Sequence, residues 1–337
     1  MRKLLLNSSA IATVAALTAS VVAVTASVAV ADVSISAFTE FKYASRSSQV
    51  TANDGTTTVD DSEITFKFSN KTDSGLTIGY VVEMESDGAA TTIDESSLSI
   101  AGGFGKFVLG NNDNVSDNYA MTALDLISEE DGVLTTSASI GSSAEIADAK
   151  DATKVAYHMP AMGGLTAGVS LEDSGVGTSD TDITAYGARY ATDAAGLALT
   201  FAAAGVHENI VATTTAVDIE RLNFGVKAVS GDITFSAAKG TYKAYDEDRS
   251  TTDMAVTYKV NADISVGAYT MSSSDTDDAG EDYSKNGMEI QYTVAPGLKA
   301  FVNHDIFKYN IATTADAAGG STKDSGSTTK LTIQAAF

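Results

Sequence analysis

The sequence contains no cysteine, no tryptophan and only two prolines among its 337 residues. Without cysteine the chain can form neither disulfides nor a cysteine-based metal site, so an exported protein of this composition must be stabilised in another way. Basic residues are also few, because 21 Lys and Arg stand against 44 Asp and Glu, giving a formal net charge of −23. Such an acidic chain argues against a nucleic-acid partner, since phosphate binding requires a basic surface.

Catalytic signals are scarce as well. The three histidines, His158, His207 and His304, lie far apart in the sequence, and no GxSxG segment occurs. The glycine-rich stretches lack the lysine that follows a phosphate-binding loop. A hydrolase would need a nucleophile, a base and an orienting group together. We therefore expect neither an enzyme nor a protein with a cofactor or a bound catalytic metal.

Only one long apolar segment is present, from Leu4 to Val30, after Arg2 and Lys3. A basic start, an apolar middle and the small-residue exit Ala29-Val30-Ala31 are typical of a cleaved secretory signal. An uncleaved membrane anchor is the alternative, although the many Ala, Ser and Thr residues insert weakly into a bilayer. We expect residues 1–31 to be removed and the folded domain to comprise residues 32–337.

The remaining chain shows apolar residues with a period of two. Stretches such as "EITFKF", "DMAVTYKV" and "GMEIQYTV" alternate apolar and polar residues, which is typical of strands with one apolar and one polar face. Sixteen such segments can be counted. Their connections alternate between seven short turns and eight longer stretches, the latter near 44–60, 86–93, 111–151, 174–181, 205–216, 240–250, 272–282 and 309–327.

Alternating short and long connections indicate a sheet whose two ends differ. A membrane barrel has this arrangement, with short periplasmic turns and long external loops, and it has no sheet edges to protect. A soluble sandwich is the alternative, but it would normally carry more large core residues than this Ala-, Gly- and Thr-rich chain. We predict an all-β fold, a 16-stranded antiparallel transmembrane β-barrel with its apolar faces toward lipid and its polar faces toward water.

The last segment, "KLTIQAAF" at 330–337, alternates up to its final residue. In a barrel this strand must close against the first one, "VSISAFTEFKY", which places Phe337 at the membrane boundary. Other aromatic residues near predicted strand ends fit the belts that barrels place at the two lipid–water boundaries, although aromatics also favour strands in general.

On these features the chain resembles a Gram-negative general diffusion porin of the alphaproteobacterial type. The resemblance covers 32–337 and rests on the N-terminal signal, the start "ADVSISAFTEFKY", the alternating connections, the long third loop and the terminal Phe337. It implies a homotrimer in the outer membrane that passes small hydrophilic solutes. It also implies that Phe337 and its strand form the signal read by the barrel-assembly machinery.

The longest connection, 111–151, is strongly acidic, and six of its carboxylates are candidates for a pore constriction: Asp113, Asp117, Asp125, Glu129, Glu130 and Asp131. A long loop without strand pattern is usually functional or disordered. Part of it, "DNYAMTALDLI", has enough apolar residues to pack against the barrel, with a short helix. A disordered acidic loop in external water is the alternative. The porin resemblance favours a loop that folds inward and narrows the pore.

Strand parity places four bases on the polar face as candidates for the pore wall: Lys42, Lys67, Lys154 and Arg221. Loop carboxylates opposite wall bases would create a transverse field that orients dipolar solutes and disfavours apolar ones. The excess of acids predicts a mild cation preference that fades with salt.

Two further acidic runs, 246–248 and 275–282, fall in predicted external loops. Such carboxylates can hold Ca²⁺ loosely, but neither run has a spaced calcium-loop signature, so solvated loops are the plainer interpretation. Two other functions stay open at this stage: a β-rich surface binding or adhesion protein, and a substrate-selective channel. Current recording in planar bilayers would separate an open channel from an adhesion protein.

Overall fold

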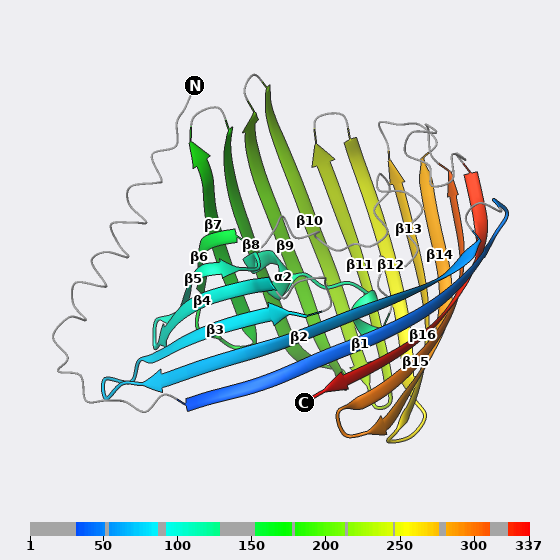
Figure 1. Ribbon diagram of the computed structural model, residues 1–337, viewed down its shortest axis with the longest axis horizontal. Coiled ribbons are helices and arrows are strands. Elements are labelled where there is room, and N and C mark those ends of the chain that lie inside the picture. Colours follow the sequence, from blue (N-terminus) through cyan, green and yellow to red (C-terminus); the bar gives the residue numbers. More distant parts are fainter. Residues whose placement is uncertain are drawn as a thin grey trace.

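The computed structural model describes residues 32–50, 54–86, 92–128, 152–176, 179–212, 215–244, 247–275, 281–310 and 323–337. Within them, sixteen antiparallel strands form one sheet that closes into a barrel (Figure 1). Each strand pairs with its neighbours in sequence, and β1 pairs with β16. The predicted fold class is confirmed. The predicted signal, 1–31, lies outside the described residues.

The strands of the first half are β1 (Asp32–Ser48), β2 (Gly55–Lys71), β3 (Thr77–Glu85), β4 (Thr92–Gly102), β5 (Gly105–Asn112), β6 (Ala152–His158), β7 (Leu165–Val176) and β8 (Ser179–Ala194). Those of the second half are β9 (Leu197–Ala212), β10 (Thr215–Ser230), β11 (Ile233–Ala244), β12 (Glu247–Lys259), β13 (Ile264–Asp275), β14 (Asp282–Ala295), β15 (Leu298–Asn310) and β16 (Lys323–Ala336). The shortest strands, β3 to β6, are consecutive.

The two faces of the sheet have opposite character, as strand β14 illustrates. Met288 and Ile290 point outward and are 71% and 54% exposed, whereas Lys285 and Glu289 point inward and are almost fully buried. Buried residues are thus polar or charged in many places, and large apolar side chains cover the outside. This is the reverse of a water-soluble protein and is typical of a barrel whose outer face contacts lipid.

The seven predicted short turns are confirmed by the strand limits, for example between β10 and β11 and between β14 and β15. Gly231 and Gly297 occupy these two turns with φ values of 57° and 79°, a region that favours glycine. Strand β10 keeps a continuous register with both neighbours, yet Ile219 is buried inside while Phe224 is exposed outside. Its apolar residues therefore change face without a bulge.

Four of the long connections were predicted too long. Residues 44–60, 174–181, 205–216 and 240–250 were expected to be loops, but β1 runs to Ser48 and β2 begins at Gly55, and β7 runs to Val176, β9 to Ala212 and β11 to Ala244. The reason is that backbone pairing continues beyond the point where side chains stop alternating. Strand ladders are held by main-chain hydrogen bonds, which do not require an apolar face.

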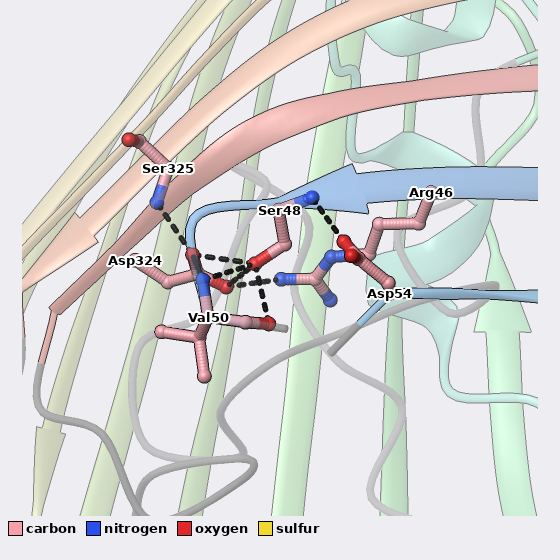
Figure 2. A network of polar contacts seen from close by, with 6 residues as sticks. All are labelled: Arg46, Ser48, Val50, Asp54, Asp324 and Ser325. Atoms are coloured by element: carbon pink, nitrogen blue, oxygen red, sulfur yellow. Dashed lines mark hydrogen bonds and ion pairs between the residues drawn. The ribbon is translucent and has the colours of Figure 1, made fainter. Parts of the chain in front are cut away.

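The barrel is closed by contacts at both ends of the β1–β16 seam. At the turn end, the N–H of Phe337 donates to the carbonyl of Ala37 (2.9 Å), so the last residue is paired as predicted. At the other end, Arg46 donates to the buried carboxylate of Asp324 (3.1 Å), which also accepts hydrogen bonds from the hydroxyl of Ser48 and the N–H of Val50 (Figure 2). The seam thus combines a strand ladder with a buried ion pair.

Two short helical elements lie between β5 and β6: α2 (Val115–Tyr119) and the 3-10 helix η2 (Leu124–Leu126). Helix α2 lies in front of β8 and β9 in Figure 1 and contacts both strands. No helix among the described residues is long and apolar enough to cross a bilayer.

Candidate functional site: a segment folded into the barrel

Residues 113–128, here called the inner segment, form the described first part of the connection between β5 and β6. Five of its apolar side chains are at least nine-tenths buried, namely Val115, Tyr119, Met121, Leu124 and Ile127, and Leu126 is partly buried. Val115 and Tyr119 cluster with Ile183, Ala185 and Val206 on the inner wall, and Leu124 and Ile127 cluster with Ala255, Tyr269 and Met271. The predicted packing of this apolar stretch, with a short helix, is therefore present.

Polar side chains of the wall bind the backbone of the inner segment. The N–H of Val115 donates to the Ser170 hydroxyl on β7 (3.1 Å). Asn223 on β10 both accepts from the N–H of Met121 and donates to its carbonyl, each at 3.0 Å. These contacts satisfy main-chain groups that have no partner in a strand ladder and that would be costly to bury alone.

Two buried carboxylates continue this arrangement further along the segment. Asp253 on β12 accepts from the N–H of Ala123 (2.8 Å), and Glu289 on β14 accepts from the N–H and the hydroxyl of Ser128 at 2.7 and 2.6 Å. Hydrogen bonds to charged acceptors are stronger than those between neutral groups. From Val115 to Ser128 the segment thus follows the inner wall from β7 to β14.

The end of α2 is held by Arg189 on β8, which donates to the carbonyls of Tyr119 (3.1 Å) and Ala120. A cation near a helix C-terminus satisfies carbonyls that lack an intrahelical partner. The Tyr119 hydroxyl lies 3.1 Å from Nδ1 of His158 on β6. Burial raises the pKa of Tyr119, and the charge of Arg189 partly offsets this effect, so the phenol stays protonated at neutral pH.

Three of the six predicted loop acids are described. The Asp125 carboxylate is exposed and accepts from the N–H and hydroxyl of Thr122 (3.2 and 2.8 Å), closing a local turn. Asp117 lies in the first turn of α2, where a negative charge is favourable. The backbone N–H of Asp113 donates to Glu95 on β4 (3.0 Å). Glu129, Glu130 and Asp131 lie outside the described residues.

The four predicted wall bases lie on strands, and three of them form ion pairs with strand carboxylates. Lys42 lies 2.5 Å from Glu40, Lys154 lies 3.7 Å from Glu172, and Arg221 lies 3.0 Å from Glu208. Lys67 on β2 is exposed. The predicted arrangement set loop acids against these bases, whereas the ion pairs found here lie within the wall. Glu40 could be predicted as a partner because it lies two residues before Lys42 on the same strand face. Glu172 and Glu208 lie on neighbouring strands, so predicting them as partners requires knowledge of the strand register.

Sequence reasoning missed the residues that hold the inner segment: Ser170, Arg189, Asn223, Asp253 and Glu289. Strand parity places all five on the inner face. The alternation does not predict, however, at which height in the barrel the inner segment passes, and so it does not predict which inward residues contact it. Among the described residues, no group of three His, Asp or Glu side chains is placed to hold a metal ion. The acidic run at 275–282 falls mostly outside the described part of the chain.

A barrel with a segment fixed along its inner wall can be compared with known proteins. The model of the Gram-negative porin family matches residues 16–311. The chain belongs to this family. As a porin it is an outer-membrane channel protein, and family and fold are those of channels rather than enzymes. A search of curated proteins gives no match.

Solved porin structures have the same fold at low sequence identity. The anion-selective porin from Comamonas acidovorans has a TM-score of 0.68 and 15% identity, covering 91% of this chain and 100% of its own. OmpT of Vibrio cholerae, in a trimer form, has a TM-score of 0.67 and 14% identity, covering 91% and 99%. A mutant Rh. blastica porin has a TM-score of 0.62 and 15% identity, covering 91% and 100%.

Proposed function

We propose that this porin is a pore for passive diffusion of small hydrophilic solutes and ions, narrowed by the inner segment. The observation that carries the proposal is the series of wall contacts at Ser170, Arg189, Asn223, Asp253 and Glu289, which spans β7 to β14. A segment fixed along those strands leaves the passage between itself and the opposite wall, formed by β16 and β1 to β4. Solutes would cross this passage in water.

A mild cation preference is part of the proposal. Three wall bases are already neutralised by Glu40, Glu172 and Glu208. Glu63 on β2 and Glu83 on β3 share the inward parity of the buried Thr65 and are only partly buried. Fixed carboxylates along a water-filled lumen raise the local concentration of cations. The preference should weaken as salt shortens the screening length, which is about 10 Å at 0.1 M.

Two features of biogenesis and assembly complete the proposal. Phe337 is 81% exposed at the end of the seam, where a terminal aromatic residue is available to the barrel-assembly machinery after export by the 1–31 signal. A homotrimer embedded in outer-membrane lipid is also proposed, and the trimer form of the Vibrio cholerae neighbour supports it. We propose no cofactor, and Ca²⁺ only as a loosely held ion at the external acidic loops.

The function is tested by current recording in planar bilayers with wild type and with a deletion of 117–131. The deletion removes most of α2, all of η2 and five of the six candidate acids, so we expect a larger conductance step and a weaker cation preference. An unchanged step would contradict the constriction. Absence of stepwise current in the wild type would contradict the channel itself and favour a surface-binding protein.

A further inference from the structure

Three strands of the inner wall repeat the same two-residue arrangement beneath the inner segment. On β7, β8 and β10 a polar residue that binds the segment is followed or preceded, two positions away on the same face, by a glycine. The pairs are Ser170 with Gly168, Arg189 with Gly187, and Asn223 with Gly225. Each polar member fixes the segment through a hydrogen bond, and each glycine leaves a gap beside it.

The gaps are filled by the inner segment itself. A Cβ atom built on Gly187 would lie 2.5 Å from Cβ of Tyr119, and one on Gly225 would lie 2.7 Å from Cβ and 2.9 Å from the carbonyl oxygen of Met121. On Gly168 it would lie 2.8 Å from the carbonyl oxygen of Tyr157 on the neighbouring strand and 2.9 Å from Val115 Cγ1. Carbon atoms in packed proteins rest at about 3.5–4.0 Å, so no side chain fits at Gly187 or Gly225 unless the segment moves, whereas Gly168 is crowded by the wall as well as by the segment.

Backbone conformation does not explain these glycines. None of the three has a positive φ, so other residues could adopt the same strand geometry. Glycine weakens a strand because it costs entropy and offers no side chain to pack, and it often marks the close approach of another backbone. Its presence at Gly187 and Gly225 is therefore accounted for by that approach, and at Gly168 the segment adds to the crowding by the neighbouring strand.

The direction of any displacement is also fixed by the structure. The wall lies on one side of the inner segment, and Asn223, Asp253 and Glu289 hold the segment at Met121, Ala123 and Ser128. The segment therefore cannot slide along the wall. A methyl group added to the wall pushes it away from the wall, toward the barrel axis. In a channel narrowed by that segment, such a movement reduces the open cross-section.

We propose that these three pairs set the bore of the channel, with the polar residues fixing the position of the inner segment and the glycines fixing how close it lies to the wall. This inference rests on the proposed function, because it assigns positioning residues to the constriction. It predicts that single wall substitutions narrow the channel, whereas deletion of the segment widens it.

The test compares single-channel conductance of wild type with Gly187→Ala, Gly225→Ala and the milder Gly267→Ala, whose Cβ would come no closer than 3.1 Å to Ile127 Cγ2 and 3.3 Å to Thr257 Cγ2. We expect a loss of conductance with the first two and a smaller loss with the third. The matched control is Gly205→Ala on β9. Its Cβ would meet Tyr186 and Leu222 on the outward face, so an equally crowded substitution should leave the conductance unchanged.

A double-mutant cycle identifies the cause of the loss. Tyr119→Gly removes the three atoms that a Cβ at position 187 would meet, so Gly187→Ala should have no effect in that background. Barrel folding is verified for each variant by heat-modifiable migration in detergent gels. Equal conductance in wild type, Gly187→Ala and Gly225→Ala, or an increase in either variant, would overturn the inference.

The same recordings separate this inference from the proposed function. A wild-type protein without current contradicts the channel. A conducting wild type whose conductance does not respond to positions 187, 225 and 267 leaves the channel intact and contradicts only the role of the three pairs.

Discussion

Asn223 is the clearest example of what a single residue does in this barrel. Its side chain is fully buried and binds both main-chain groups of Met121, as a neighbouring strand would. Its carboxamide offers a donor and an acceptor in one small planar group. The hold on the inner segment therefore depends on the amide and not merely on its volume.

Replacing Asn223 with leucine should loosen the segment without unfolding the barrel. The substitution leaves a buried N–H and a buried carbonyl without their partner, which costs about 1–3 kcal/mol. We expect larger fluctuations of the open-channel current, measured as excess noise in single-channel records. Asn209→Leu is the control, because that amide bonds Asp218 away from the segment. Current noise equal to that of wild type would show that the amide does not hold the segment.

The proposed cation preference can also be tested at individual residues. Glu63→Gln combined with Glu83→Gln removes two lumenal carboxylates, so the reversal potential in a salt gradient should shift toward that of a non-selective pore. The shift should shrink in high salt, since the screening length falls from about 10 Å at 0.1 M to about 3 Å at 1 M. Glu220→Gln changes the same charge at an exposed position of β10 outside the lumen and should have no effect. An equal shift of the reversal potential in the Glu220→Gln control would contradict the proposal that lumenal carboxylates produce the cation preference.

At the scale of elements, the seam between β1 and β16 contains a buried ion pair in addition to its strand ladder. The side chains of Arg46 and Asp324 are 4% and 0% exposed, and Arg46 also lies 4.2 Å from the ring centroid of Phe307. Removing Asp324 would leave the buried guanidinium of Arg46 without this carboxylate, which is costly. The effect falls on β1 and β16, which are paired with each other but are not connected by a turn.

Asp324→Ala should therefore lower the free energy of unfolding by about 3–5 kcal/mol, which is typical of a broken buried pair. The measurement is the midpoint of heat- or denaturant-induced barrel unfolding in detergent micelles. Lys243→Met breaks an ion pair whose side chains are 58% and 39% exposed, and such pairs contribute only about 0–1 kcal/mol. Similar midpoints for the two variants would contradict the importance of the seam pair.

The elements also show how far the sequence can predict this structure. Period-two alternation, as in β12 and β14, predicted the strand number, the turns and the closure by 330–337, because lipid on one side and water on the other demand it. It could not predict the strand end near 208–212, where two polar residues, Glu208 and Asn209, are followed by two apolar ones, Ile210 and Val211, and the alternation is lost. The residues that hold the inner segment could not be predicted either. Asn223 and Asp253 bind the segment because it passes next to them inside the barrel, and the segment has no sequence periodicity that would predict its path.

For the whole molecule, the fold and the proposed pore both require that the inner face of the barrel contacts water and the outer face contacts lipid. The inner face carries buried charges such as Lys330 and Asp305, 3.8 Å apart, and the outer face carries large exposed apolar side chains. A protein with this distribution needs detergent or lipid to remain dispersed. The same distribution of polar residues inside and apolar residues outside stabilises the barrel in a membrane and lines a channel with polar groups.

The most direct test uses the absence of native cysteine to introduce single thiols on adjacent positions of β14. Gln291 points into the lumen, and Ile290 is 54% exposed on the outer face. In reconstituted membranes, Gln291→Cys should react with a small charged thiol reagent and lose part of its current. Ile290→Cys, in lipid, should not react. Reaction at 290 with protection at 291 would contradict the orientation on which the account rests.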